Sequence, residues 1–202
     1  NRERSGDDVV VRPSAEGAAG VRLQVVADNI IRVTADPAGK FERAESLMRV
    51  PSGAKAPAFE VSEADGQLRV AAAGVSATVS LEDGHVAFFD AAGKPLVSEV
   101  AGGRSFTATE FDGRPYYSIR QRFAGNADES LHGTGLHQQG WMDLKGRDVE
   151  LLQHNIDNAI PFVQSSRRYA ILWDNNSITS LGDPRGLRPL GETLVLRDAD
   201  GK

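Results

Sequence analysis

The chain has 202 residues, of which 40% are hydrophobic and 25% are charged, and its formal net charge is −5 at pH 7. This composition is typical of a globular domain with a substantial core and excludes wholesale disorder. The acidic balance argues against nucleic acid as a partner. No apolar run approaches the roughly 18–20 residues that a membrane-spanning helix needs, so we expect no membrane partner.

The sequence contains no cysteine, which excludes disulfides and thiolate metal sites. No cofactor is expected. Residues 1–8 are polar and lack the apolar stretch of a signal peptide. We expect a periplasmic or secreted protein, in which this polar start is the mature end left by processing, with the cytoplasm as the alternative.

The first predicted elements form a β-hairpin. Residues 21–26 and 30–34 are short runs rich in β-branched residues, and Ala27-Asp28-Asn29 between them supplies a turn. Residues 39–57 are less regular and are predicted to form a loop.

Alternation of apolar and polar residues then predicts a series of strands separated by turns. Asp65-Gly66, Asp83-Gly84 and Asp112-Gly113 are strong hairpin signals. The predicted strands are 68–72, 75–81, 85–89, 95–100, 105–111, 116–123, 149–154, 160–164, 169–173 and 178–181. No segment shows a sustained 3.6-residue apolar period. The sequence therefore predicts an all-β fold, an antiparallel β-sandwich or barrel of about a dozen strands.

Two histidines and two glycines lie close together after these strands. His132 and His137 are five residues apart, which is not the i, i+4 spacing of a helical zinc site. We expect hydrogen-bonding roles for both and no metal site. Gly133-Thr134-Gly135 lacks the lysine and the following helix of a phosphate loop, so these glycines are expected to permit a tight turn or a close backbone approach.

Candidate catalytic groups do not form a recognisable set. No G-x-S-x-G elbow surrounds Ser165 and Ser166, which favours a turn or a polar sheet position for them. Glycoside hydrolysis needs two carboxyls that face each other across the scissile bond, and the sequence alone pairs none of its acids. The acids of the second half are Glu129, Asp143, Asp148, Glu150, Asp157, Asp174 and Asp183.

Several motifs follow one another between residues 129 and 175. They are Glu129-Ser130-Leu131-His132-Gly133-Thr134-Gly135, His137-Gln138-Gln139-Gly140, Leu151-Leu152-Gln153-His154-Asn155, and a run from Ile160-Pro161-Phe162 through Ser165-Ser166-Arg167-Arg168-Tyr169 to Trp173-Asp174-Asn175. This region resembles the end of the N-terminal domain of family 31 glycoside hydrolases. The second and third motifs are most similar to the bacterial α-xylosidase branch of that family.

The sequence departs from the family pattern at a few positions. His132 stands where an aromatic residue is usual, Thr134 replaces an apolar residue, and Leu136 stands where many members carry Glu or Gln. Arg168 and Ala170 replace glycines on either side of a tyrosine. These departures weaken the assignment to the α-xylosidase branch more than they weaken the assignment to the family.

The resemblance implies an antiparallel β-sandwich of the galactose-mutarotase-like type over residues 1–182. Residues 183–202 would form a boundary segment that leads to an inserted lobe or to the catalytic barrel. The resemblance also implies a retaining α-glycosidase that acts on oligosaccharides with α-linked xylose or glucose, using two aspartates of a (β/α)8 barrel of the same polypeptide. No βα alternation occurs in this chain. No catalytic residue is therefore named, and poor activity of these residues alone is expected.

In the family, one loop of the sandwich reaches over the active-site mouth, and residues 153–159 match that loop. Asn155 and Asp157 align with its Asn-x-Asp, which implies that Asp157, with Asn155 and Asn158, helps to form a substrate subsite. A carboxylate suits this role because charge-assisted hydrogen bonds to sugar hydroxyls are stronger than neutral ones. The alternative is a turn at Asp157-Asn158, which both residue types favour.

Two other functions fit the same fold class. A stand-alone carbohydrate-binding module should expose aromatic residues on one face, and only 6% of the residues are aromatic. The candidates for stacking on a sugar ring are Trp141, Tyr116, Tyr117 and Trp173. An aldose-1-epimerase-like enzyme needs a histidine and a glutamate in one cleft, but His132, His137 and His154 all fall within the family match.

Overall fold

The computed structural model describes residues 2–5, 8–41, 46–48, 57–153 and 155–182. Those residues form fifteen β-strands and no α-helix, which confirms the predicted all-β class. None of them belongs to a helix that could cross a membrane. The chain folds into two compact units, one made of Asn1–Glu129 and Ser165–Tyr169 and the other of Ser130–Gln164 and Ala170–Lys202. The predicted boundary segment, residues 183–202, lies outside the described residues.

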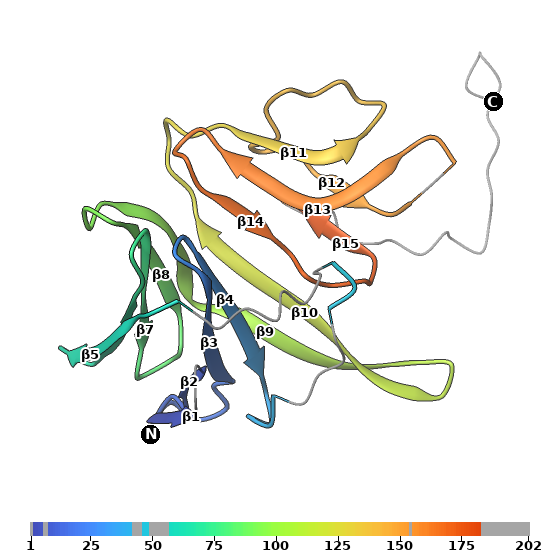
Figure 1. Cartoon of the computed structure of the whole chain (residues 1–202). Coiled ribbons are helices and arrows are strands. Elements are labelled where there is room, and N and C mark those ends of the chain that lie inside the picture. Colours follow the sequence, from blue (N-terminus) through green and yellow to red (C-terminus); the bar gives the residue numbers. More distant parts are fainter. Residues whose placement is uncertain (1, 6–7, 42–45, 49–56, 154, 183–202) are drawn as a thin grey trace, which may run out of the picture. The chain divides into compact units, whose positions relative to one another are not determined.

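The first unit contains two antiparallel sheets (Figure 1). One sheet has four strands in the order β1-β2-β3-β4, and the other has six in the order β10-β9-β8-β7-β6-β5. The strands are β1 (Arg2–Ser5), β2 (Asp8–Val11), β3 (Gly20–Ala27), β4 (Ile30–Asp36), β5 (Glu60–Ala64), β6 (Gln67–Ala71), β7 (Val75–Ser80), β8 (Val86–Asp90), β9 (Pro95–Phe111) and β10 (Arg114–Ala124). At two of the predicted hairpins, Asp65-Gly66 and Asp112-Gly113, both turn residues have positive φ. That backbone matches the right-handed twist of paired strands.

The two sheets of the first unit share a core of aliphatic side chains. Val21, Leu23 and Val25 alternate along β3 with less buried residues, and Leu68 and Val70 do the same along β6. All five belong to one buried cluster, to which both sheets contribute. Fully burying a Val or Leu side chain stabilises a fold by roughly 1.5–3 kcal/mol. The alternation that predicted a sandwich therefore also supplies its core.

Strand β9 differs from the prediction, which placed separate strands at 95–100 and 105–111. It is one strand of 17 residues with a register shift near its middle. Arg104 pairs with Gln121 and the next pair is Glu99 with Phe123, so residues 100–103 face only one residue of β10. Gly102 in this bulge has a φ of 63°, which glycine adopts without steric cost. Gly102 and Gly103, which lie between the two predicted strands, allow a bulge within one strand.

Beyond the bulge, β9 pairs with β10 alone. Strand β8 pairs with β9 only through residues 95–98, and the rest of β9 continues with β10 as a two-stranded ribbon. Figure 1 shows this hairpin extending past the end of β8, in yellow-green.

The second unit contains two small sheets. Strands β11 (Leu131–Leu136), β13 (Asn158–Ser165) and β14 (Ala170–Leu172) form one in the order β11-β13-β14, and β12 (Val149–Leu151) pairs with β15 (Thr179–Leu181) in the other. Leu144, Val149 and Leu151 form a small buried cluster. Strand β11 was not predicted, because its two glycines favoured a loop. Strand β12 is shorter than the predicted 149–154.

Candidate functional site

The loop proposed from the sequence lies in the second unit, between β12 and β13. Strand β12 ends at Leu151, and β13 begins at Asn158. The side chains of Asn155 and Asn158 are exposed, whereas Asp157 is partly buried. His154 lies outside the described residues. The turn residues therefore present two amides to solvent and one carboxylate toward the protein.

Asp157 has a carboxylate oxygen in an unusual state. Its Oδ1 atom is buried and has no hydrogen-bond partner among the described residues. Gln153 braces the backbone around it, because its Nε2 donates to the Asp157 carbonyl at 2.6 Å and its Oε1 accepts from the Ala159 N–H at 3.2 Å. The loop backbone is thus held in place while one carboxylate oxygen stays unpaired. The motif alone did not indicate this bracing by Gln153.

The Gly-Thr-Gly segment of β11 allows a close approach to β13. A Cβ on Gly135 would lie 1.7 Å from the Asn158 carbonyl oxygen, and one on Gly133 would lie 2.6 Å from that of Phe162. Thr134 between them is 1% exposed and has a φ of 66°, which is rare for a β-branched residue. The predicted close backbone approach is confirmed. It brings the end of β11 beside Asn158, where the loop ends.

The two histidines near this segment are held by hydrogen bonds. Nδ1 of His132 lies 2.6 Å from the Met142 carbonyl oxygen, and its Nε2 lies 2.9 Å from Ser130 Oγ. Nε2 of His137 lies 2.8 Å from the Thr134 carbonyl oxygen. The predicted hydrogen-bonding roles are confirmed. Over the described ranges, no group of three or more His, Cys, Asp or Glu side chains is arranged to hold a metal ion.

The aromatic candidates differ in their surroundings. Trp141 is 37% exposed, and the guanidinium of Arg147 lies 5.2 Å from its ring centroid, so this unit already uses one face of the indole. Trp173 is partly buried after β14. Tyr116 and Tyr117 are consecutive in β10 and so point to opposite faces of that strand. Those two tyrosines therefore do not form a shared platform for a sugar.

Glu129 of the first unit is the centre of a buried hydrogen-bond cluster. It is 6% exposed, and its Oε1 accepts from Ser165 Oγ and from the Tyr169 hydroxyl, each at 2.5 Å. Its Oε2 accepts from the backbone N–H and the side-chain amide of Asn126, each at 3.3 Å. Burial alone would raise the pKa of Glu129, but these hydrogen bonds hold it below its ordinary value. We call Glu129, Ser165, Tyr169 and Asn126 the Glu129 clamp.

The Glu129 clamp explains the position of Ser165, one of the sequence candidates. Ser165 donates its hydroxyl proton to a carboxylate and accepts from the Arg167 N–H at 2.9 Å, so it holds a turn, as predicted, and is not poised as a nucleophile. Arg168 lies in the same turn and has a φ of 69°, a conformation that glycine adopts without steric cost.

Two further acids from the second half of the sequence are Asp143 and Asp183. Asp143 accepts from the backbone N–H groups of Lys145 and Leu131, at 3.0 and 2.9 Å, and these bonds lower its pKa. It therefore serves a turn. Asp183 lies outside the described residues.

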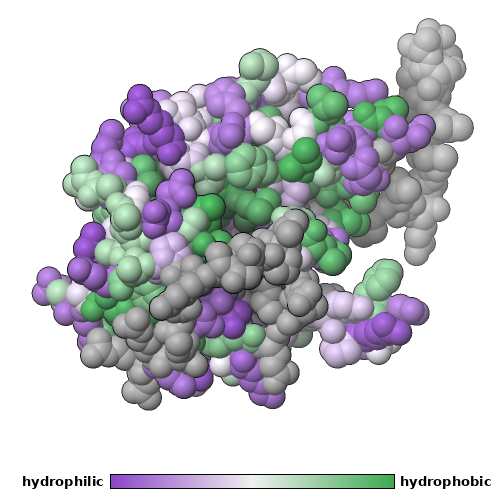
Figure 2. All heavy atoms as spheres, in the orientation of Figure 1, coloured by the Kyte–Doolittle hydropathy of each residue, from purple (hydrophilic) through white to green (hydrophobic). Residues whose placement is uncertain are grey.

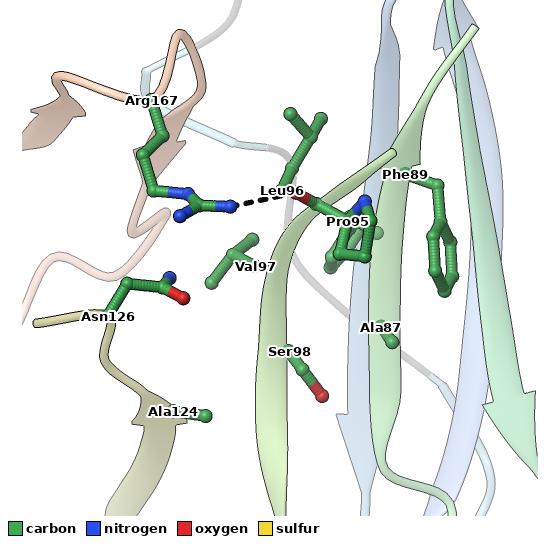
Figure 3. A pocket seen from close by; sticks show the side chains of 10 residues that line it. Ala87, Phe89, Pro95, Leu96, Val97, Ser98, Ala124, Asn126 and Arg167 are labelled. Carbon is green, nitrogen blue, oxygen red and sulfur yellow. Dashed lines mark hydrogen bonds between the residues drawn. The ribbon is translucent and has the colours of Figure 1, made fainter. Parts of the chain in front are cut away.

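One small cavity of the first unit is mainly apolar (Figure 3). It has a volume of about 210 Å³, and Phe88, Phe89 and Val97 contribute to its wall. Figure 3 shows Arg167 reaching toward it and donating to the Pro95 carbonyl oxygen, at 3.3 Å. Ligand pockets usually have volumes of roughly 300–1,000 Å³, so this cavity is too small for an oligosaccharide.

A larger cavity of about 450 Å³ in the first unit is bordered by Asp83, His85, Glu99 and Arg104. These groups pair with one another. Asp83 Oδ1 lies 2.6 Å from His85 Nδ1, and Glu99 Oε2 accepts from Arg104 Nη2 at 2.5 Å. Burial alone would raise the pKa of Asp83, but its hydrogen bonds, the strongest from His85, lower it to about 2. Burial raises the pKa of Glu99, and Arg104 only partly offsets this.

His85 and Glu99 border this cavity and are the residue types that an epimerase would need, but they are not arranged as a catalytic acid and base. Glu99 is 7% exposed, and besides Arg104 it accepts from the Val86 N–H at 2.9 Å. Arg104 in turn donates to the Gly84 carbonyl oxygen at 3.2 Å. The ion pair therefore ties the β9 bulge to the turn before β8, which is a structural role.

Replacing Arg104 with methionine is expected to lower the free energy of unfolding by about 3 kcal/mol at pH 7, because it leaves Glu99 buried without its cation. Since burial already raises the pKa of Glu99, the native variant binds a proton more tightly than its unfolded chain does. The decrease in the free energy of unfolding, relative to the wild type, should therefore shrink as the pH falls. Urea unfolding at several pH values measures it, and the double variant Arg104→Met with Glu99→Gln is the control. A double variant as unstable as the single one would contradict this explanation.

The chain is similar to several known proteins. The glycosyl hydrolase 31 N-terminal galactose mutarotase-like domain matches residues 20–181. The GH31 alpha-xylosidase of Xanthomonas citri is 57% identical, with a TM-score of 0.89, over 99% of this chain and 22% of that one. A GH31 alpha-xylosidase from a soil metagenome, solved with xylose, is 25% identical, with a TM-score of 0.74, over 90% of this chain and 29% of that one.

A curated relative is similar over a comparable region. An uncharacterized family 31 glucosidase of Pseudescherichia vulneris is 32% identical over 179 residues, which are 78% of this chain and 33% of the relative. The chain thus spans about a third of that relative and 22% of the Xanthomonas citri protein.

Proposed function

The chain belongs to the N-terminal galactose mutarotase-like domains of family 31 glycoside hydrolases, and on this premise we propose that it is the non-catalytic N-terminal domain of an α-xylosidase. The complete polypeptide would hydrolyse oligosaccharides with α-linked xylose, or glucose, at a catalytic barrel outside this chain. The α-xylosidase identity of the Xanthomonas citri protein, at 57% sequence identity, supports xylose over glucose.

One observation supports the proposal that this chain takes part in substrate binding. Asp157 keeps a buried carboxylate oxygen without a partner among the described residues, while Gln153 fixes the backbone around it. A buried carboxylate oxygen is costly unless a donor satisfies it. A sugar hydroxyl is a donor of this kind, but because the oxygen has no exposed surface the loop must open for a hydroxyl to reach it; a hydrogen bond to a charged acceptor then contributes roughly 1.5–3 kcal/mol. Asn155 and Asn158 flank Asp157 with exposed amides that can both donate to and accept from hydroxyls.

Replacing Asp157 with alanine in the complete polypeptide is expected to lower kcat/KM on an aryl α-xyloside by roughly 10- to 100-fold, the loss of one charge-assisted hydrogen bond. The matched control is Glu150→Ala, which removes an exposed carboxylate from the neighbouring strand β12. It should leave both kinetic constants unchanged. Steady-state kinetics of the three proteins, with thermal unfolding to confirm equal folding, measure the difference.

Two results would argue against the substrate role. Unchanged kcat and KM in Asp157→Ala would leave the carboxylate as a turn residue, the alternative that its sequence context allows. An equal loss in Glu150→Ala would attribute the effect to general electrostatics.

A further inference from the structure

The larger cavity of the first unit, with a volume of about 450 Å³, has walls that are fixed to one another. Residues 15–19, the turn before β8 and the β9 bulge all border it. The Ala15 N–H donates to the Glu82 carbonyl oxygen at 2.8 Å, which joins the first two walls. The Gly102 N–H donates to Asp83 Oδ2 at 3.2 Å, which joins the turn to the bulge. The cavity is therefore preformed, and a preformed site lowers the entropic cost of binding a ligand.

His85 borders this cavity with one ring nitrogen that has no partner. Its Nδ1 lies 2.6 Å from Asp83 Oδ1, and within the described ranges its Nε2 has no hydrogen-bond partner. Asp83, whose pKa is lowered to about 2, is ionised at neutral pH and can only accept hydrogen bonds. Nδ1 therefore holds the proton that it donates to Asp83, so in the neutral ring Nε2 is a hydrogen-bond acceptor. The atom that is left for a ligand matches a hydroxyl donor.

The charged groups of this cavity favour a neutral ligand. Arg104 is paired with Glu99, and both oxygens of Asp83 already accept hydrogen bonds. A bound ion would have to compete with these contacts. Glu16 also borders the cavity, but it is exposed, and a single exposed carboxylate attracts a cation only weakly in water. It can still accept from a hydroxyl.

Phe106 gives the same cavity an apolar surface. It lies near the base of the β9–β10 ribbon, whose tip projects at the lower right of Figure 2. Its ring packs edge to face against Tyr117, with centroids 5.9 Å apart at an interplanar angle of 84°, which fixes its orientation. A sugar ring presents C–H groups on its faces and hydroxyls around its edge, so it matches an aromatic ring beside a hydrogen-bond acceptor. The cavity volume falls within the range of roughly 300–1,000 Å³ that ligand pockets have.

We propose that this cavity, which we call the His85 cavity, binds the ring of a neutral pentose or hexose. His85 Nε2 accepts from a sugar hydroxyl, and Phe106 lies against an apolar face of the ring. The site binds without reacting, because it holds no catalytic acid and base. It goes beyond the proposed function, since it depends neither on the loop at 153–159 nor on a catalytic barrel.

Hydrogen–deuterium exchange of the complete polypeptide, titrated with D-xylose and with D-glucose through the millimolar range, tests the site. A bound sugar should slow amide exchange in residues 80–86 and 99–106, which supply walls of the His85 cavity. His85→Asn keeps an N–H where Nδ1 lies but has no atom in the place of Nε2. It should raise the sugar concentration for half-maximal protection roughly tenfold, the loss of one hydrogen bond. His85→Gln, whose amide reaches the place of Nε2, should weaken protection less.

A second pair of variants tests the aromatic wall and applies even if the His85 variants fold poorly. Phe106→Leu keeps an apolar side chain but removes the ring, so protection by sugar should need a several-fold higher concentration. Phe111→Leu makes the same change at an exposed position of the same strand that does not border the cavity. It should leave protection unchanged.

Kinetics on an aryl α-xyloside separate this inference from the proposed function. His85→Asn should leave kcat and KM unchanged, and a parallel loss of kcat/KM would trace the protection to the substrate site and overturn the proposal. So would no protection by either sugar, equal protection in His85→Asn, Phe106→Leu and the wild type, or protection by tetramethylammonium alone. If the wild-type polypeptide has no α-glycosidase activity, the proposed function fails, while the exchange experiment still decides the His85 cavity.

Discussion

Replacing Glu129 with alanine is expected to lower the free energy of unfolding by about 4 kcal/mol at pH 7. The change leaves the buried hydroxyl of Ser165 and the partly buried hydroxyl of Tyr169 without their carboxylate acceptor, and an unsatisfied buried group costs roughly 1–3 kcal/mol. Urea unfolding measures the difference from the wild type. Glu129→Gln should lose less than half as much, because its amide oxygen still accepts from the hydroxyls. An alanine variant as stable as the wild type would show that the Glu129 clamp is incidental.

The stability that Glu129 contributes should depend on pH. The Glu129 clamp holds the pKa of this carboxyl below its ordinary value, so the native state favours the carboxylate more than the unfolded chain does. The contribution is complete above the unfolded pKa of roughly 4.3 and is lost as the pH falls through the folded pKa. The gap between the wild type and Glu129→Gln should therefore narrow below about pH 4. A gap that stays constant into that acid range would contradict the assignment of the pKa.

Gly135→Ala is expected to cost about 4 kcal/mol or more, which is exceptional for a single substitution. Its Cβ would lie 1.7 Å from the Asn158 carbonyl oxygen, and φ at this position is 98°, so strands β11 and β13 would have to separate. Gly140→Ala is the matched control, since Gly140 also has a positive φ, 67°, but no atom lies within 4 Å of its Cβ position. It should cost roughly 1 kcal/mol, the conformational price of a left-handed alanine.

Thermal unfolding of both glycine variants checks this comparison. Equal destabilisation would mean that backbone conformation, and not the close approach of the strands, limits both positions. Because Asn158 directly follows Asp157, any Gly135→Ala protein that does fold should also bind substrate more weakly than Gly140→Ala.

The strands that the sequence predicted well are those with clear alternation and Asp-Gly turns. Strands β6, β7 and β8 lie within a residue of their predicted bounds because one buried face imposes a two-residue period. Strand β11 was missed because its glycines carry no side-chain pattern, although they serve a close pairing. The β9 bulge was interpreted as a break for a related reason: glycine permits both structures, and only the long-range pairing decides between them.

The candidate site was predictable only in part. The family motif located Asp157 in a loop, but it did not reveal the unpaired Oδ1 or the bracing by Gln153, which depend on the local backbone path. The Glu129 clamp was beyond prediction for a different reason. Its partners Ser165 and Tyr169 are 36 and 40 residues away along the chain, and a single sequence carries no distances across such intervals.

The most direct test of the central claim is a comparison of two proteins on an aryl α-xyloside and an aryl α-glucoside. One is the complete polypeptide, and the other is the chain of 202 residues. We predict that the complete polypeptide hydrolyses the xyloside with the higher kcat/KM and that the shorter chain shows no turnover. Enzyme-like turnover by the 202 residues alone, or no α-glycoside hydrolysis by the complete polypeptide, would contradict the account.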